Sequence, residues 1–95
     1  MNIKRASDIS GTHLIGYITI TYKELVAVLG QPHLTDGDKI TAEWNLETVE
    51  GVVITIYDYK EDETPKGLYD WHIGGHGPLA LTVVQQLFPS HKVGR

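Results

Sequence analysis

The sequence predicts a small α+β domain in which two helices cover one face of a small antiparallel sheet, in the chain order β-α-β-β-β-α. Three observations predict this class. A capped amphipathic helix follows a β-rich segment near residue 20, apolar and polar residues alternate from residue 40, and a second apolar stripe follows Gly77-Pro78. The chain of 95 residues is long enough for one domain.

The first predicted elements are a strand and a helix. Residues 13–20 are rich in β-formers, which predicts a strand. Thr21 and Glu24 have the spacing of a capping box, in which each side chain satisfies a backbone N–H of the other residue. The helix has one apolar face, formed by Tyr22, Leu25, Val26 and Leu29. Gly30 and Pro32 are expected to end it.

Three more strands and a second helix are expected. A turn is predicted at Asp36-Gly37-Asp38, then paired strands over residues 40–47 and 52–59 that reverse at Glu50-Gly51. A solvated loop over residues 61–67, a third strand over residues 68–73 and a helix from Gly77-Pro78 to Pro89 follow. Residues 1–10 are interpreted as a loose arm, residues 11–89 as the domain and residues 90–95 as a polar tail.

Three aromatic and acidic side chains in these strands have special positions. Trp44 and Trp71 fall on the apolar sides of their strands, so we expect them to pack in the core. Asp58 also falls on an apolar side. It lies either at a frayed strand end or as a buried carboxylate with a Lys, His or backbone N–H partner.

Composition excludes several classes of function. The chain has no cysteine, so it has no disulfide framework and no thiolate nucleophile or metal ligand. The formal net charge of −4 argues against general nucleic-acid binding, which depends on clustered Lys and Arg. No apolar stretch approaches the ~20 residues that cross a membrane, and residues 1–8 do not resemble a signal peptide. We therefore expect a soluble intracellular protein with no membrane partner.

Several motifs in fixed order resemble a known group of proteins. They are Tyr22-x-x-Leu25-x-x-x-Leu29-Gly30-x-Pro32, Glu43-Trp44, Thr55-Ile56-Tyr57-Asp58-Tyr59-Lys60 and Trp71-His72-Ile73-Gly74-Gly75. The chain resembles a family of small, mostly uncharacterised proteins of tailed bacteriophages and prophages. The resemblance implies expression in the cytoplasm of an infected bacterium. Small acidic phage proteins of this kind often act on host defences.

Polar and aromatic residues gather on the predicted open face of the sheet. Strand parity places six side chains there: Glu43, Asn45, Tyr57, Tyr59, Asp70 and His72. Two tyrosines and a histidine on one face suit the stacking of a planar ring. The alternative is that tyrosines simply fit a half-exposed strand.

A glycine-rich segment precedes the second helix. Gly74, Gly75, His76 and Gly77 run into a helix N-terminus, where free N–H groups and the helix dipole favour an anion. Lys60 or Lys66 would add a positive charge. The alternative is a tight turn that needs glycine for a positive φ. His72 and His76 are four residues apart but span a strand end and a loop, so no metal site and no cofactor are expected.

The leading hypothesis is a binding protein that sequesters a phosphate-bearing nucleotide signal of host defence. The ligand-binding residues would be Tyr57, Tyr59, Lys60, His72, Gly74, Gly75, His76 and Gly77. An enzyme is not expected, because no nucleophile has a base and an orienting partner. A chain this small encloses little of a ligand, so we expect a homodimer or higher homo-oligomer.

The alternative hypothesis is an acidic inhibitor that blocks a host defence protein such as a CRISPR effector. The carboxylates that would form its surface are Asp36, Asp38, Glu43, Glu47, Glu50, Glu61, Asp62 and Glu63. Three lysines interrupt this surface: Lys39, Lys60 and Lys66.

Overall fold

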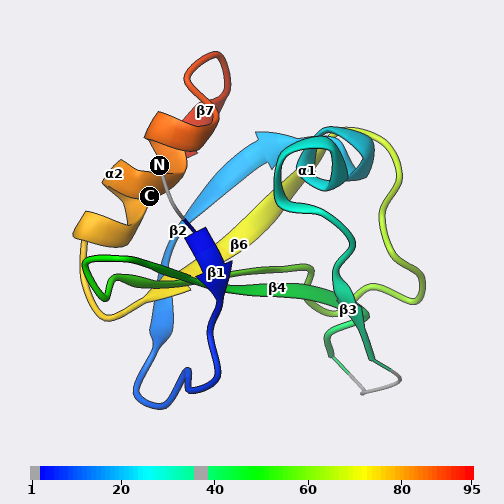
Figure 1. Ribbon diagram of the computed structural model, residues 1–95. Helices are drawn as coiled ribbons and strands as arrows, with labels where there is room; N and C mark the ends of the chain where they lie inside the picture. The colour runs from blue at the N-terminus through cyan, green and yellow to red at the C-terminus, as the bar shows by residue number, and fades with distance from the viewer. Residues whose placement is uncertain (1–2, 36–38) are drawn as a thin grey trace.

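A computed structural model describes residues 3–35 and 39–95 and contains a seven-stranded antiparallel sheet with two helices (Figure 1). The predicted α+β class is confirmed. The elements are β1 (Ile3–Arg5), β2 (His13–Ile20), α1 (Tyr22–Leu29), β3 (His33–Leu34), β4 (Ala42–Thr48), β5 (Val53–Tyr57), β6 (Tyr69–Gly75), α2 (Leu79–Leu87) and β7 (Lys92–Gly94). The strands lie in the order β1-β4-β5-β6-β2-β7, and β3 also pairs with β4.

Both helices cover the same face of the sheet, as predicted. Leu25 of α1 and Val84 of α2 belong to one core cluster with the inward side chains of the central strands. Trp44 and Trp71 lie in this core with ring centroids 5.5 Å apart. Their indole N–H groups donate to the carbonyls of Gly30 and Ile20, so neither buried donor is left unpaired.

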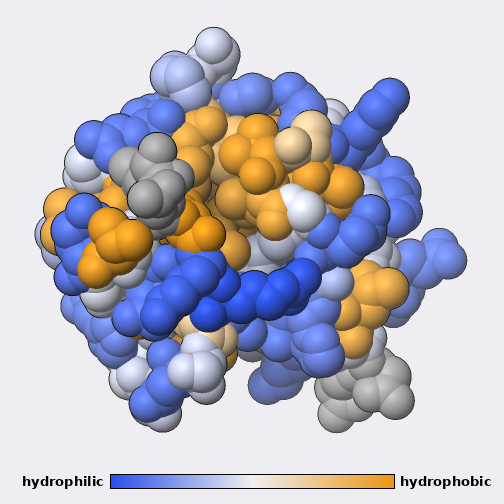
Figure 2. Space-filling model, in the orientation of Figure 1, coloured by the Kyte–Doolittle hydropathy of each residue, from blue (hydrophilic) through white to orange (hydrophobic). Residues whose placement is uncertain are grey.

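The space between the two helices is apolar at the surface. Figure 2 shows apolar side chains gathered there, above the blue side chains of the β1 region. Val28 and Leu29 of α1, Leu46 of β4 and Leu87 of α2 line a groove of about 340 Å³ at this position. Within the described residues, no helix is long and apolar enough to cross a membrane.

Helix α1 begins as predicted. The Thr21 side chain accepts a hydrogen bond from the Glu24 backbone, and the Glu24 side chain accepts one from the Thr21 backbone. Gly30 ends the helix with φ = 85°, a conformation that glycine adopts without steric cost. The Glu24 carboxylate also lies 2.8 Å from Nε2 of His91, which ties the C-terminal segment to the start of α1.

The segments expected to be an arm and a tail each contribute a strand. β1 pairs with the Leu46–Thr48 end of β4, and β7 pairs with residues 17–19 of β2. Ile3 and Val93 pack against the core from these strands. Three-residue strands carry too little alternation to stand out from polar sequence, so sequence patterning missed both.

The central strands differ from the expected bounds at their ends. β4 begins two residues later than predicted and ends one residue later, at Thr48, while β5 is shorter than predicted at both ends. β6 begins at Tyr69 and extends beyond residue 73 to Gly75. Gly74 and Gly75 were expected to form a loop and instead pair with both β2 and β5. The turn predicted at Asp36-Gly37-Asp38 lies outside the described residues.

Asp58 is a buried carboxylate at the end of β5, the second of the two positions expected for it. Its side chain is 0% exposed and accepts hydrogen bonds from the backbone N–H groups of Thr41 and Ala42, at 2.8 and 3.1 Å. The Thr41 hydroxyl donates to the other carboxylate oxygen. Asp58 therefore closes the end of the hairpin where the strand ladder stops, a structural role that accounts for all three contacts.

Candidate functional site

On the open face of the sheet, a row of side chains crosses the central strands. In this row, Tyr57 is paired with Glu43 on one side and with His72 on the other, and His72 is paired with Tyr17. Residues directly opposite each other on neighbouring strands point to the same face. These side chains are therefore neighbours on the face that the helices leave open.

His72 is surrounded by three tyrosine rings. Its ring lies stacked on Tyr57 at a centroid distance of 5.3 Å, with Tyr59 at 5.4 Å and Tyr17 edge-on at 4.9 Å. The predicted grouping of Tyr57, Tyr59 and His72 is confirmed. We call His72, Tyr17, Tyr57 and Tyr59 the aromatic cluster. Sequence patterning did not find Tyr17, because the pairing of β2 with β6 joins segments about fifty residues apart.

Burial favours the neutral forms of two members of the aromatic cluster, His72 and Tyr57. Desolvation lowers the pKa of His72 below its ordinary value, against the opposing fields of Asp58 and Glu61. Desolvation also raises the pKa of the Tyr57 hydroxyl, and the neighbouring Tyr17 and Tyr59 raise it further. Within the described part of the chain, the buried Nδ1 of His72 has no hydrogen-bond partner. The pKa shifts of His72 and Tyr57 therefore both favour their uncharged forms.

A concavity of about 260 Å³ opens beside this surface. Tyr57 and Tyr59 form one wall. The remaining lining comes from the sheet, from the β1–β2 connection and from the segment before β4: Glu43, Asn45, Thr55, Gly74, His13, Ile9, Thr12 and Ile40. Oδ1 of Asn45 is buried and, among the described residues, has no hydrogen-bond partner. The concavity therefore combines an aromatic wall with an unused hydrogen-bond acceptor.

Gly74 and Gly75 serve opposite faces of the sheet. A Cβ atom on Gly74 would lie 2.3 Å from Oγ1 of Thr55, on the open face. A Cβ atom on Gly75 would lie 2.7 Å from Cβ of Ala80 in α2, on the helix face. Neither glycine has a positive φ, so the expectation of a turn that requires one is wrong. Both positions need glycine because a neighbour approaches closely.

The N-terminus of α2 does not join the aromatic cluster. It follows Gly75 on the helix face, so the sheet separates it from His72. The N–H groups of Ala80 and Leu81 already donate to the carbonyls of Gly77 and Pro78, which leaves fewer donors for an anion than expected. The eight predicted binding residues therefore do not form one site, and Gly75, His76 and Gly77 lie apart from the others.

His76 and Gly77 line a separate, smaller hollow of about 220 Å³ with Val52 and Val53 of the hairpin. The His76 side chain is exposed and lies against the backbone of Gly11 in the β1–β2 connection. His76 lies beyond the end of β6 and beside the start of α2, so the two imidazoles have different surroundings. Within the described residues, no group of three His, Asp or Glu side chains is placed to hold a metal ion.

Lys60 is the cation beside the aromatic cluster. Its Nζ lies 5.4 Å from the centre of the Tyr59 ring, and its backbone has φ = 59°. Its backbone N–H donates to the carbonyl of Lys39, which anchors this bend. Lys66 instead lies over Tyr22 at 3.8 Å, beside the core tryptophans. Of the two lysines considered, only Lys60 is placed to reach a ligand on the open face.

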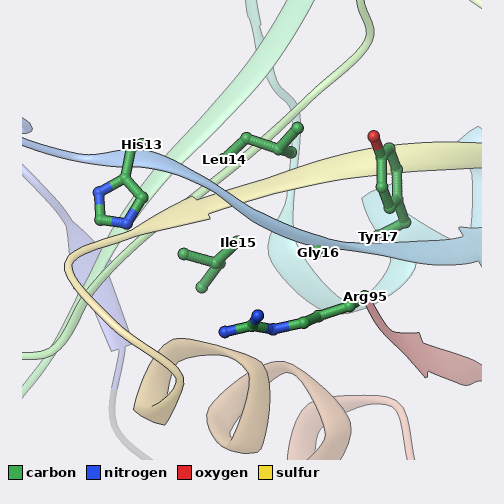
Figure 3. Close-up of a pocket in the computed structure, with 6 residues that line it drawn as sticks. All are labelled: His13, Leu14, Ile15, Gly16, Tyr17 and Arg95. Atoms are coloured by element: carbon green, nitrogen blue, oxygen red, sulfur yellow. The ribbon is translucent and has the colours of Figure 1, made fainter.

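A larger hollow of about 390 Å³ lies along β2 and includes the terminal Arg95. Figure 3 shows Ile15 and Arg95 on the side of the strand that faces α2, and Tyr17 on the opposite side. The strand thus divides its lining between the two faces of the sheet. Fewer of its lining residues can contact the same ligand than in the concavity beside Tyr57.

Comparisons with protein-family models, with curated proteins and with solved structures give no match for this chain. The resemblance to small bacteriophage proteins stays a prediction. The geometry of the open face is therefore the basis on which a function can be argued.

Proposed function

We propose that this chain is a binding protein that holds the base of a small nucleotide on the open face of its sheet. The observation that carries the proposal is the aromatic cluster, three tyrosines around a neutral histidine, opening on a concavity with an unused acceptor. Stacking of a base on an aromatic side chain contributes about 1–3 kcal/mol. No reaction is proposed for the bound molecule.

The size of the concavity limits what it encloses. Its volume of about 260 Å³ is below the range of about 300–1,000 Å³ typical of pockets that bury a whole drug-sized ligand. A single ring system is therefore the part that enters, and the sugar and phosphate remain outside. Lys60, exposed at the edge of the cluster, supplies the charge for the phosphate.

The biological role that we propose combines this site with the resemblance to bacteriophage proteins. A phage-encoded protein that binds a nucleotide signal without altering it would sequester that signal and so counter the host defence. The site of action would be the cytoplasm of the infected bacterium. This role follows from the resemblance and from the aromatic cluster together.

The first prediction tests stacking. Titration calorimetry with nucleoside monophosphates and cyclic nucleotides should detect binding, and Tyr57→Ala should weaken it about tenfold or more because one stacking partner is lost. Tyr57→Phe keeps the ring and should bind nearly as the wild type does. His76→Ala is the matched control, since this exposed side chain lies away from the cluster.

Failure of every tested nucleotide to bind or to stabilise the protein at millimolar concentration would overturn the proposal. Equal weakening by Tyr57→Ala and His76→Ala would also count against it, because only the first residue lies on the open face.

The acidic-inhibitor alternative has one observation in its favour. Glu61, Asp62 and Glu63 are consecutive and exposed in the loop between β5 and β6. Reversal of Asp62 and Glu63 to lysine should leave nucleotide affinity unchanged if the proposed site is correct. A loss of protection from host defence in that variant, with nucleotide binding retained, would instead support an inhibitor acting through this loop.

A further inference from the structure

The β4 side of the concavity beside Tyr57 carries hydrogen-bond acceptors. Glu43 contributes a carboxylate, which accepts only, and Asn45 presents an oxygen that is buried and has no partner among the described residues. Away from β4, the lining includes Thr12, His13 and Thr55, whose side chains can donate as well as accept, and it includes neither Lys nor Arg. A ligand group that donates hydrogen bonds is therefore favoured at the β4 side of the concavity.

The two acceptors have a fixed relation to the aromatic wall. Glu43 and Asn45 are two residues apart on β4, so they point to the same face about 7 Å apart. Glu43 is directly opposite Tyr57 in the strand pairing, and Asn45 is opposite Thr55. A ring stacked on Tyr57 within the concavity thus turns one edge toward β4 and its acceptors.

An unpaired buried acceptor costs free energy, and a ligand donor placed against it removes that cost. A carbonyl oxygen in the same place leaves the acceptor unpaired and adds repulsion between two oxygens. We infer that the site selects nucleobases with an exocyclic amino group over otherwise similar bases that carry a carbonyl oxygen there. The inference rests on the proposed function and names the class of base that the open face takes.

The test uses ligand pairs that differ at this group. Calorimetry should show that adenosine monophosphate binds at least about tenfold more tightly than inosine monophosphate, and cytidine monophosphate more tightly than uridine monophosphate. Each pair keeps the same ring size, sugar and phosphate. Within each pair the bases differ only in the exocyclic group and in the ring nitrogen beside it, which accepts in the amino base and carries a hydrogen in the carbonyl base. The ratio within a pair therefore reports recognition of this edge of the base.

Two variants locate the discrimination. Asn45→Leu removes the unpaired acceptor, and Glu43→Gln gives the carboxylate position a donor as well as an acceptor. Each should reduce the ratio within a pair. Glu47→Gln is the matched control, because Glu47 is on the same face of β4 but does not line the concavity, and its ratio should equal that of the wild type.

The possible results separate this inference from the function on which it depends. Equal affinity within both pairs overturns the amino-group inference and leaves the nucleotide-binding proposal standing. Absence of binding by all four nucleotides overturns the nucleotide-binding proposal and the inference with it. A ratio above tenfold that persists in both Asn45→Leu and Glu43→Gln overturns the assignment to β4.

Discussion

His72 has an unusual position for a histidine on an open sheet face. Three phenol rings surround it, and its buried Nδ1 lacks a partner within the described residues. The imidazole thus acts as an aromatic ring and stays neutral when an ordinary histidine would begin to take up a proton. Its protonation would place a charge where three rings now pack.

This position predicts a pH dependence of stability. Because the pKa of His72 is lowered in the folded protein, the unfolded chain binds the extra proton first as the pH falls through about 6.5. The free energy of unfolding should therefore decrease below about pH 6.5, until the pH reaches the folded-state pKa. His72→Gln should lack this part of the decrease.

Urea unfolding of both proteins at about pH 7.5 and pH 5.5 measures the effect as a difference between wild type and variant. The other titrating groups, including the Glu24–His91 pair, are common to both proteins and cancel. An identical change with pH in the two proteins would contradict the proposed burial of His72.

Single-residue parity was the most informative feature of the sequence for the candidate site. It placed Tyr57 and His72 on one face because each belongs to a strand with clear alternation. It did not reach Gly74 and Gly75, because the predicted strand ends at residue 73. Close approach of a hydroxyl and of a helix, which actually requires these glycines, depends on tertiary packing that a single sequence does not display.

At the scale of elements, β7 is held to the sheet through a close contact with β2. A Cβ atom on Gly16 of β2 would lie 2.6 Å from the carbonyl oxygen of Gly94 and 2.7 Å from Cδ2 of Leu81. The leucine can move, but the carbonyl belongs to the paired strand. Gly16 therefore sets how closely β7 and α2 approach β2.

Gly16→Ala should displace β7 and lower the free energy of unfolding by about 1–3 kcal/mol, as overpacking of a core typically does. Amide hydrogen exchange of Val93 should accelerate, and urea unfolding should give the loss of stability. Gly67→Ala is the control, since its added Cβ meets nothing within 4 Å and Gly67 has no positive φ. Matching results for the two variants would show that the Gly16–Gly94 contact is unimportant.

The predictability of the elements depended on their length. The capping box of α1 and the alternation of β4 are local patterns, and both led to correct elements. β1 and β7 have three residues each and depend on pairing with distant strands, so their sequences alone did not indicate them. The strand order has the same origin, because β2 reaches β6 only across the intervening hairpin.

At the scale of the whole molecule, the open face is covered by neither helix. Tyr17 is 37% exposed there, and the adjoining concavity admits only one ring system. We propose that a second copy of the chain covers this face and encloses the rest of the ligand, in a homodimer with one ligand per chain. Such a dimer buries aromatic surface that a monomer leaves in water.

Native mass spectrometry of the protein with adenosine monophosphate should show a dimer carrying two ligands. Tyr17→Glu introduces a charge on the proposed interface and should shift the population toward monomer, while Glu50→Lys, at an exposed turn, should not. If the wild-type protein binds the nucleotide while it remains a monomer, the dimer is contradicted and the proposed binding site is retained.

The alternation of Gly74 and Gly75 between the two faces has a consequence for sequence variation among relatives of this chain. A side chain at position 75 requires space at Ala80, whereas a side chain at position 74 requires the removal of the Thr55 hydroxyl. Adjacent glycines should therefore covary with different partners. Position 75 should vary together with Ala80 of α2, and position 74 together with Thr55 of β5. Two adjacent residues would then be constrained separately, one by helix packing and the other by the open face of the sheet.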